Sequence, residues 1–254
     1  MITVFYADTA GAEASELVAK YLDSIDAQHR AKVTAYKPVR SKNLSLAAAI
    51  LLQVGVRALT DPEGLDNDLF STGDDGIAFL NYDDFLLLYE PLKLTYDTGE
   101  YGKPSLRGLN DLPFSISHSG TVAALSIGDE ESGMDVQYHR PANYMRIAER
   151  FFTEEEVSFL RAARSKTSEE HALHVFHDLW SAKEAFVKYT GEGLFRPFDD
   201  FSAQLRYTPG APLQGVIEPD GASLLYPIEI PDYSFSLCTK NEPDVRVLRV
   251  VVNA

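Results

Sequence analysis

The chain has 254 residues, of which 45% are hydrophobic and 24% are charged, and this composition excludes a disordered, collagen-like or low-complexity protein. A chain of this length forms one large or two small domains and can bury a substantial core. Its formal net charge of -15 disfavours broad binding to nucleic acid or to anionic membranes, because surfaces of the same sign repel at long range. The single cysteine, Cys238, excludes an internal disulfide and a CxxC-type zinc or redox site.

The amino-terminal residues do not form a basic segment followed by a long apolar one, so they do not predict a secretion signal. The sequence contains no uninterrupted run of about 18 apolar residues, the length that a membrane-spanning helix needs. We therefore expect a cytoplasmic protein whose partners include neither nucleic acid nor a membrane.

The first half predicts a mixture of helices and strands. Residues 2–6 alternate and are rich in strand formers, whereas residues 13–24 have helical spacing. Residues 44–59 are apolar almost all round and contain strong helix formers, which predicts a buried central helix. Residues 61–76 are rich in Gly, Asp and Asn and predict a loop, and periodicity does not decide whether 85–89 is helix or strand.

Charge is unevenly distributed over this half. Residues 20–42, called the basic segment below, carry six cationic side chains opposed only by Asp23 and Asp26. A solvated helix face is the simplest interpretation of such a run, but in an acidic chain it also marks the best candidate site for an anion. We assign no function to the acidic residues 66–91. The cations of the basic segment are Lys20, Arg30, Lys32, Lys37, Arg40 and Lys42.

The rest of the chain continues the mixed pattern. Residues 153–164 begin with Thr153 and have Glu156 three positions on, which is a capping-box pattern. A long helix is expected over 168–190, ending at Gly191, and strands and turns follow over 198–252. Each half then has a long apolar helix and several short strands, so we predict an α+β fold with halves 1–127 and 128–254. The other expected elements are strands at 92–96, 114–117, 122–127 and 133–137, a turn at 97–104 and a helix at 144–152.

The segment WSAKEAFVK, residues 180–188, carries the densest set of candidate site residues. On a helix Glu184 and Lys188 lie one turn apart on one face, with Lys183 adjoining. The simple interpretation is a surface ion pair worth about 0.3 to 0.5 kcal/mol. The functional interpretation is a carboxylate for a hard cation beside two ammonium groups for phosphate oxygens.

The segment GMDVQ, residues 133–137, predicts a short strand. Alternation places Met134 and Val136 on the core face and Asp135 with Gln137 on the other face. Asp135 could be an exposed edge residue, but oxygen-bearing side chains at i and i+2 can also share one octahedral ion if a further carboxylate such as Glu184 approaches.

The segment FSISHSG, residues 114–120, offers hydroxyls and an imidazole. Neighbours on a strand point to opposite faces, and the sequence has no GxSxG elbow, so Ser117 and His118 do not predict a hydrolase dyad. These side chains and the backbone at Gly120 could bind an anion, or His118 could fix the turn. Lys103, in the turn before Pro104, is either a ligand contact or an ordinary loop lysine.

The order of five motifs resembles 4′-phosphopantetheinyl transferases of the surfactin-synthetase-activating type, over residues 102–201. That resemblance implies a pseudo-twofold monomer of two α/β halves, each a small, mainly antiparallel sheet packed on a long helix, with coenzyme A and Mg²⁺ in the cleft between them. It also implies transfer of phosphopantetheine from coenzyme A to a serine of an apo acyl or peptidyl carrier protein, with release of adenosine 3′,5′-bisphosphate. The motifs are GKP (102–104), FSISHS (114–119), GMDVQ (133–137), RFFTEEE (150–156) and WSAKEAFVKYTGEGL (180–194).

The resemblance also implies roles for single residues. Asp135 and Glu184 resemble the metal ligands, and with Lys188 they form the implied catalytic group. Gln137 is a third metal candidate, but many relatives have Glu there, and an amide is a poorer ligand that could act through water. Mn²⁺ accepts the same oxygen ligands as Mg²⁺. The residues implied to bind the coenzyme are Lys103, Ser117, His118, Lys183, Lys188, Lys32 and Arg40, with His29 beside them.

Several alternatives stay open at this point. The basic segment could attract the anionic coenzyme or an acidic carrier protein. The apolar residues Leu194, Phe195 and Phe198 could contact a carrier helix or belong to the core. A non-catalytic relative that only binds coenzyme A or a carrier protein is the main alternative function, and a serine hydrolase using Ser117 and His118 is the other.

Overall fold

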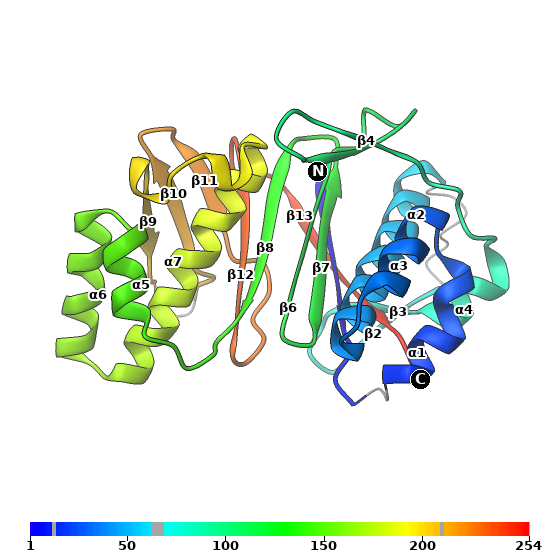
Figure 1. The fold of residues 1–254 in the computed structure, drawn as a ribbon, viewed down its shortest axis with the longest axis horizontal. Coiled ribbons are helices and arrows are strands. Elements are labelled where there is room, and N and C mark those ends of the chain that lie inside the picture. The colour runs from blue at the N-terminus through cyan, green and yellow to red at the C-terminus, as the bar shows by residue number, and fades with distance from the viewer. Residues whose placement is uncertain (12–13, 62–68, 209–210, 254) are drawn as a thin grey trace. The chain divides into compact units, whose positions relative to one another are not determined.

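The computed structural model describes residues 1–11, 14–61, 69–208 and 211–253 (Figure 1). Contacts divide the chain into two compact units. Unit 1 comprises residues 1–97, 104–130 and 244–254, and unit 2 comprises residues 98–103 and 131–243.

Unit 1 is built on a six-stranded sheet of order β2-β3-β13-β1-β7-β6. At its centre β1 pairs in parallel with β13 and antiparallel with β7, and β6 and β7 form an antiparallel hairpin. The strands are β1 (Ile2–Asp8), β2 (Phe70–Thr72), β3 (Ala78–Asn81), β6 (Phe114–Ser119), β7 (Val122–Gly128) and β13 (Val245–Val251).

Helix α3 (Val39–Thr60) forms the core of unit 1, and residues 43–56 are all buried. It is long and apolar enough to span a membrane by composition, but 78% of its most apolar window is buried inside the structure. Its apolar surface packs on the sheet, and a Cβ at Gly55 would lie only 2.8 Å from Leu125 Cδ2. The remaining helices of unit 1 are α1 (Ala14–Tyr21), η1 (Leu22–Ser24), α2 (Ala27–Ala35) and α4 (Tyr82–Leu88).

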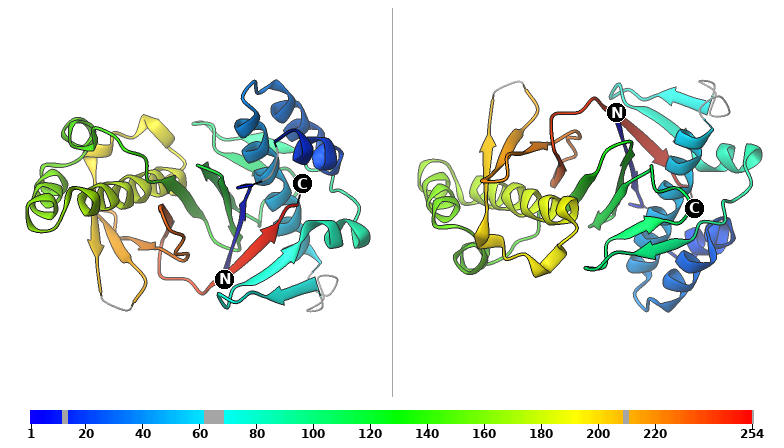
Figure 2. Two further views of the ribbon diagram at one scale, coloured as in Figure 1. Left: turned by 90° about the horizontal axis from the view of Figure 1, so that it is seen from below. Right: turned by 90° about the horizontal axis from the view of Figure 1, so that it is seen from above.

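Unit 2 contains an antiparallel five-stranded sheet of order β8-β12-β11-β10-β9. Helix α7 (Glu169–Thr190) packs along β8 and β12, as Figures 1 and 2 show. Ser168 caps its first turn, and Gly191 ends it in the left-handed conformation at φ +78°, which favours glycine. The strands are β8 (Ser132–Tyr138), β9 (Ser202–Arg206), β10 (Gln214–Glu218), β11 (Ala222–Leu225) and β12 (Tyr233–Thr239).

Shorter elements complete the architecture. Helix α6 (Glu154–Lys166) begins with the predicted capping box, in which Thr153 and Glu156 bond each other's backbone. A separate two-stranded sheet pairs β4 (Tyr96–Thr98) with β5 (Pro104–Leu106). The other helices of unit 2 are α5 (Tyr144–Phe151), η3 (Gly193–Phe195) and η4 (Phe198–Asp200).

The predicted α+β class, with a sheet packed on a long helix in each half, is confirmed, since α3 and α7 are both 22 residues long. The units differ from the predicted halves 1–127 and 128–254, since residues 98–103 belong to unit 2 and residues 128–130 belong to unit 1. Residues 244–254 belong to unit 1, because β13 pairs with β1 and β3. Pairing between strands far apart in sequence leaves no local signal.

Some single elements also differ from prediction. Residues 92–95 do not form the expected strand, and β4 begins only at Tyr96. The expected loop over 61–76 contains the strand β2, and its residues 62–68 lie outside the described part of the chain. The undecided segment 85–89 is mostly helix α4. Helix α2, within the basic segment, was not anticipated as a separate element.

Candidate active site

The site begins with the close approach of β8 to α7. A Cβ at Gly133 would lie 1.9 Å from the carbonyl oxygen of Ala185 and 2.4 Å from the backbone nitrogen of Tyr189. Only glycine permits this spacing, and it shows that the side of β8 carrying Gly133 faces the helix. Because side chains alternate along a strand, Asp135 and Gln137 project from the same side. Met134 and Val136, on the other side, are buried as expected.

Asp135 and Lys188 meet across this contact. Lys188 Nζ lies 2.7 Å from Asp135 Oδ1 and donates a further hydrogen bond of 3.1 Å to the carbonyl of Met134. The Asp135 residue is 4% exposed, so the pair is strengthened by a low local dielectric. Ser181 Oγ donates to the Asp135 carbonyl at 3.5 Å. The structure thus brings Asp135 of β8 to the helix face that carries Lys188.

Glu184 lies one turn before Lys188 on α7, and its environment raises its pKa to about 7. Burial is the main cause, followed by the negative charge of Asp135, and the positive charge of Lys188 opposes both. Two carboxylates close enough to repel each other are the groups that a divalent cation would stabilise. The three predicted catalytic residues are therefore gathered at one place in unit 2.

The donor set fits a hard divalent ion. Mg²⁺ in phosphate-transferring sites is commonly held by one or two carboxylates together with substrate phosphates and water. Among the residues that the structure describes, no group of three or more His, Cys, Asp and Glu side chains is arranged to hold a metal. An ion at Asp135 and Glu184 could complete its ligand set with phosphate oxygens and water. Ligation by Gln137, which lies on the same face of β8 as Asp135, stays a prediction.

Lys183 is placed differently from the sequence-based expectation of a phosphate contact. Its side chain is fully buried, and Nζ bonds the carbonyls of Phe198 and Phe201 at 2.6 Å and Glu156 Oε2 at 2.9 Å. These three partners use all three hydrogens of the ammonium group. In this structure Lys183 holds α7 against its neighbours and offers no donor to a ligand.

No sequence pattern indicated a role for Glu156 beyond the helix cap. Besides capping α6, its Oε1 accepts from the backbone nitrogen of Ala203 at 2.7 Å, and its Oε2 pairs with Lys183. One carboxylate therefore joins α6, β9 and α7. The motif order already placed RFFTEEE and WSAKEAF in one resemblance, but only the fold shows that Glu156 and Lys183 meet.

Lys103 lies near the end of α7 that carries Lys188. Its Nζ donates to the carbonyl of Tyr189 at 3.2 Å and pairs with Glu131 Oε2 at 2.7 Å. Its Cδ would lie 3.3 Å from a Cβ at Gly191. The loop 98–103 is thereby attached to the carboxyl end of α7.

The other predicted coenzyme contacts lie in unit 1. Ser117 is buried whereas its neighbour His118 is exposed, in keeping with opposite strand faces and against a hydrolase dyad. Arg40 Nε donates to the Gly120 carbonyl at 2.5 Å, so the basic segment reaches the turn after His118. Lys32 is exposed on α2, and His29 Nδ1 lies 2.8 Å from Asp26 Oδ2.

A histidine cluster lies farther along the α7–β8 contact and was not predicted. The ring of His139, just after β8, lies 5.0 Å from that of His177 and 4.7 Å from that of His174. Burial lowers the pKa of His139 to about 3, and the electrostatic effects of His177 and His174 act in the same direction. His139 is therefore neutral near pH 7, unlike the charged group of Asp135 and Lys188.

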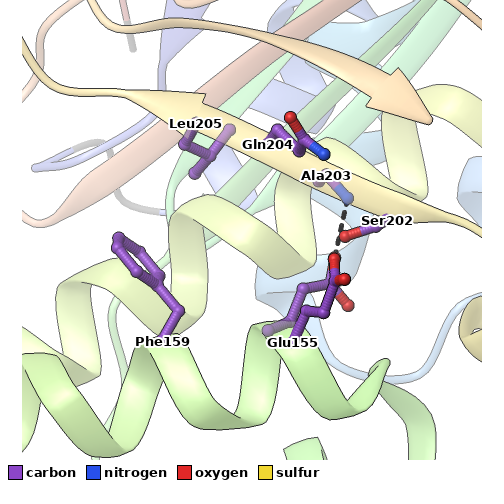
Figure 3. A pocket seen from close by; sticks show the side chains of 7 residues that line it. Glu155, Phe159, Ser202, Ala203, Gln204 and Leu205 are labelled. Atoms are coloured by element: carbon purple, nitrogen blue, oxygen red, sulfur yellow. Dashed lines mark hydrogen bonds between the residues drawn. The ribbon is translucent and has the colours of Figure 1, made fainter.

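A pocket of about 230 Å³ lies between α6 and β9, apart from the predicted site residues (Figure 3). Glu155 and Phe159 line it from the helix, and Leu205 lines it from the strand. The dashed bond from the Ala203 nitrogen to Glu156 crosses its edge. We assign it no role in the chemistry.

Comparison with known proteins supports the family resemblance. Residues 131–238 match the family model of the 4'-phosphopantetheinyl transferase superfamily. The chain is 36% identical over 117 residues to a 4'-phosphopantetheinyl transferase of Bacillus subtilis, covering 46% of this chain and 50% of that protein. It is 39% identical over 112 residues to Sfp of Bacillus subtilis strain 168, and this match covers 44% of this chain and 48% of Sfp. It is also 31% identical over 149 residues to psf-1 of Bacillus pumilus, and this match covers 58% of this chain and 61% of psf-1.

The chain spans about half the length of the first of these curated relatives. The matched region includes β8 and α7, and with them Asp135, Glu184 and Lys188. Residues 131–238 therefore match the 4′-phosphopantetheinyl transferase superfamily, the family that the order of the motifs predicted.

Proposed function

We propose that the chain transfers 4′-phosphopantetheine from coenzyme A to a serine hydroxyl of an apo carrier protein and releases adenosine 3′,5′-bisphosphate. The observation that carries the proposal is the grouping of Asp135, Glu184 and Lys188 where β8 meets α7. The names of the similar proteins support the same reaction.

The residues of the site divide the chemistry between them. The serine oxygen attacks the phosphorus that bears pantetheine, and the bond from that phosphorus to the bridging oxygen of the diphosphate breaks. Asp135 and Glu184 would hold Mg²⁺, or Mn²⁺, which supplies positive charge to the diphosphate as negative charge grows there. The Lys188 ammonium would stabilise the negative charge of the departing phosphate. Glu184, or a water molecule beside it, would accept the serine proton.

We assign coenzyme binding to cationic and hydrogen-bonding side chains, taking those of each unit by themselves. Arg40, Lys32 and the turn at His118 offer positive charge and donors in unit 1, and Lys103 offers an ammonium group in unit 2. Local basic groups are needed because the chain as a whole repels anions. We further propose that the protein acts as a monomer in the cytoplasm, which rests on the sequence and the family resemblance.

The first test replaces each carboxylate of the site. We expect Asp135→Ala and Glu184→Ala each to leave a folded protein whose transfer rate, with Mg²⁺, falls by about 100-fold or more, because the charge on the diphosphate is no longer offset. Mass spectrometry of an apo carrier protein after incubation with coenzyme A measures the transfer.

Glu155→Ala is the matched control, since Glu155 is an exposed carboxylate of the same unit outside the site. Near-normal transfer by either site variant would contradict the assignment of the site. Binding of coenzyme A by the wild-type chain without transfer to any apo carrier would instead identify a non-catalytic relative.

A further inference from the structure

Three large apolar side chains are exposed together in unit 2. Leu194 is 82% exposed, Phe195 76% and Tyr101 46%, and the rings of Tyr101 and Phe195 lie 5.4 Å apart. We call these three residues the apolar patch. Side chains of this size are usually buried, and a cluster of them on a surface marks an interaction site more often than a single exposed residue does. Phe198, in contrast, is buried in the core of unit 2.

The patch lies beside the catalytic end of α7. Leu194 and Phe195 are in η3, directly after the helix ends at Gly191, and Tyr101 is in the loop that Lys103 attaches to the Tyr189 carbonyl. Arg196 packs inward, with its guanidinium 4.7 Å from the ring of Phe186. The two side chains before it, those of Leu194 and Phe195, are exposed instead. A protein docked on the patch would contact the end of α7 that carries Lys188.

Charge around the patch restricts what can dock there. Lys103 is paired with Glu131, and Arg196 is paired with both Glu192 and Asp220. Glu100 is exposed in the same loop as Tyr101. Carboxylates therefore outnumber cations around the apolar patch. A partner with an acidic face would be repelled there, whereas an apolar face of neutral or positive charge would not.

We propose that the apolar patch docks the acceptor carrier protein, and that it selects carriers whose face beside the acceptor serine is apolar and carries no net negative charge. This inference rests on the proposed function, because it assumes that a protein serine must reach Glu184 and Lys188. The net charge of -15 acts in the same direction at longer range. Apolar contacts then supply the affinity, and the acidic surrounding supplies the selectivity.

The test compares two apo carrier domains of the same fold, one with a near-neutral and one with an acidic face beside the serine. For the wild-type chain we expect a lower KM for the near-neutral carrier. The double variant L194S/F195S should raise that KM by about tenfold or more, since exposed anchors of this size contribute strongly when buried by a partner. Its kcat at saturating carrier and its Kd for coenzyme A should not change.

The matched control is L87S/L88S, which removes two leucines of 82% and 63% exposure from unit 1 and should leave both KM values unchanged. Glu100→Lys should lower the KM for the acidic carrier, and this gain should shrink at high salt. An unchanged KM in L194S/F195S, with wild-type transfer intact, would overturn the docking site and leave the proposed function standing. Absence of transfer by the wild-type chain to either carrier would overturn both.

Discussion

Glu184 is held in the folded protein under conditions that favour its protonated form. Burial and the nearby charge of Asp135 raise its pKa to about 7, whereas an exposed glutamate has a pKa near 4.5. The folded chain therefore binds this proton more tightly than the unfolded chain does. Folding stability from this group is present below about pH 4.5, falls as the pH rises towards 7, and is at its minimum above that.

Replacing Glu184 with glutamine should remove this pH dependence. Each unit of pKa shift corresponds to about 1.4 kcal/mol, so Glu184→Gln should be more stable than the wild type by about 3 kcal/mol at pH 8 and equal to it at low pH, where the wild-type carboxyl is protonated in both states. Urea unfolding at both pH values, in the presence of a chelator, measures the difference. Added Mg²⁺ should stabilise the wild type at pH 8 and have less effect on the variant. Equal stability at pH 8 would contradict the raised pKa of Glu184, and with it the burial that is its main cause.

The contact between β8 and α7 is the element on which the site depends. The odd-numbered residues of the strand face the helix because Gly133 allows the two backbones to approach. The helix contributes Glu184 and Lys188 from successive turns of one face. Any change that separates the two elements must also separate Asp135 from Lys188.

Gly133→Ala should therefore affect both stability and transfer. The added methyl group would overlap the Ala185 carbonyl, and overpacking of this kind costs about 1 to 3 kcal/mol in the free energy of unfolding. Displacement of β8 should lower transfer by more than the lost folded fraction explains. Gly99→Ala is the control, because its Cβ would be 3.4 Å from its nearest neighbour, which is ordinary contact. A Gly133→Ala protein with normal stability would show that α7 can move away from β8 at no cost in the free energy of unfolding.

The ion pair of Lys183 and Glu156 makes a second prediction for α7. Lys183→Met leaves the Glu156 carboxylate buried without its cation, which typically costs about 3 to 5 kcal/mol. Thermal or urea unfolding measures the loss, and the double variant K183M/E156Q should recover part of it. A phosphate-binding lysine would behave differently, raising the Kd for coenzyme A without lowering stability.

For the molecule as a whole, the distribution of charge decides how an anionic coenzyme is attracted. The net charge is -15, yet the basic segment places Lys32 and Arg40 on the surface of unit 1, and Arg40 contacts the turn after His118. Local positive charge can outweigh a distant negative one because screening limits electrostatic reach to about 10 Å at 0.1 M salt.

The double variant K32A/R40A should accordingly weaken coenzyme A binding, by about tenfold at low ionic strength and by much less at about 0.5 M salt. Calorimetric titration at several salt concentrations measures the Kd. Lys166→Ala, which removes an exposed cation of unit 2, is the control and should change little. A loss of affinity that is independent of salt would point to altered folding of the turn at Gly120.

Much of this protein could be predicted from local sequence pattern. The apolar row of α3, the capping box at Thr153 and the glycine that ends α7 are short-range features, and each predicted its element correctly. The order of the motifs likewise identified the family. These signals survive in the sequence because they act between residues a few positions apart.

Other features were decided only by the tertiary structure. Lys183 and Lys188 are two lysines of the same helix, and the sequence does not show which of them is buried. Their burial depends on the positions of Glu156 and of the carbonyls that bind Lys183. The placement of β13 in unit 1, the meeting of Arg40 with Gly120, and the exposure of Leu194 and Phe195 are likewise long-range outcomes. Burial depends on which distant segments pack together, and that information is not contained in the spacing of neighbouring residues.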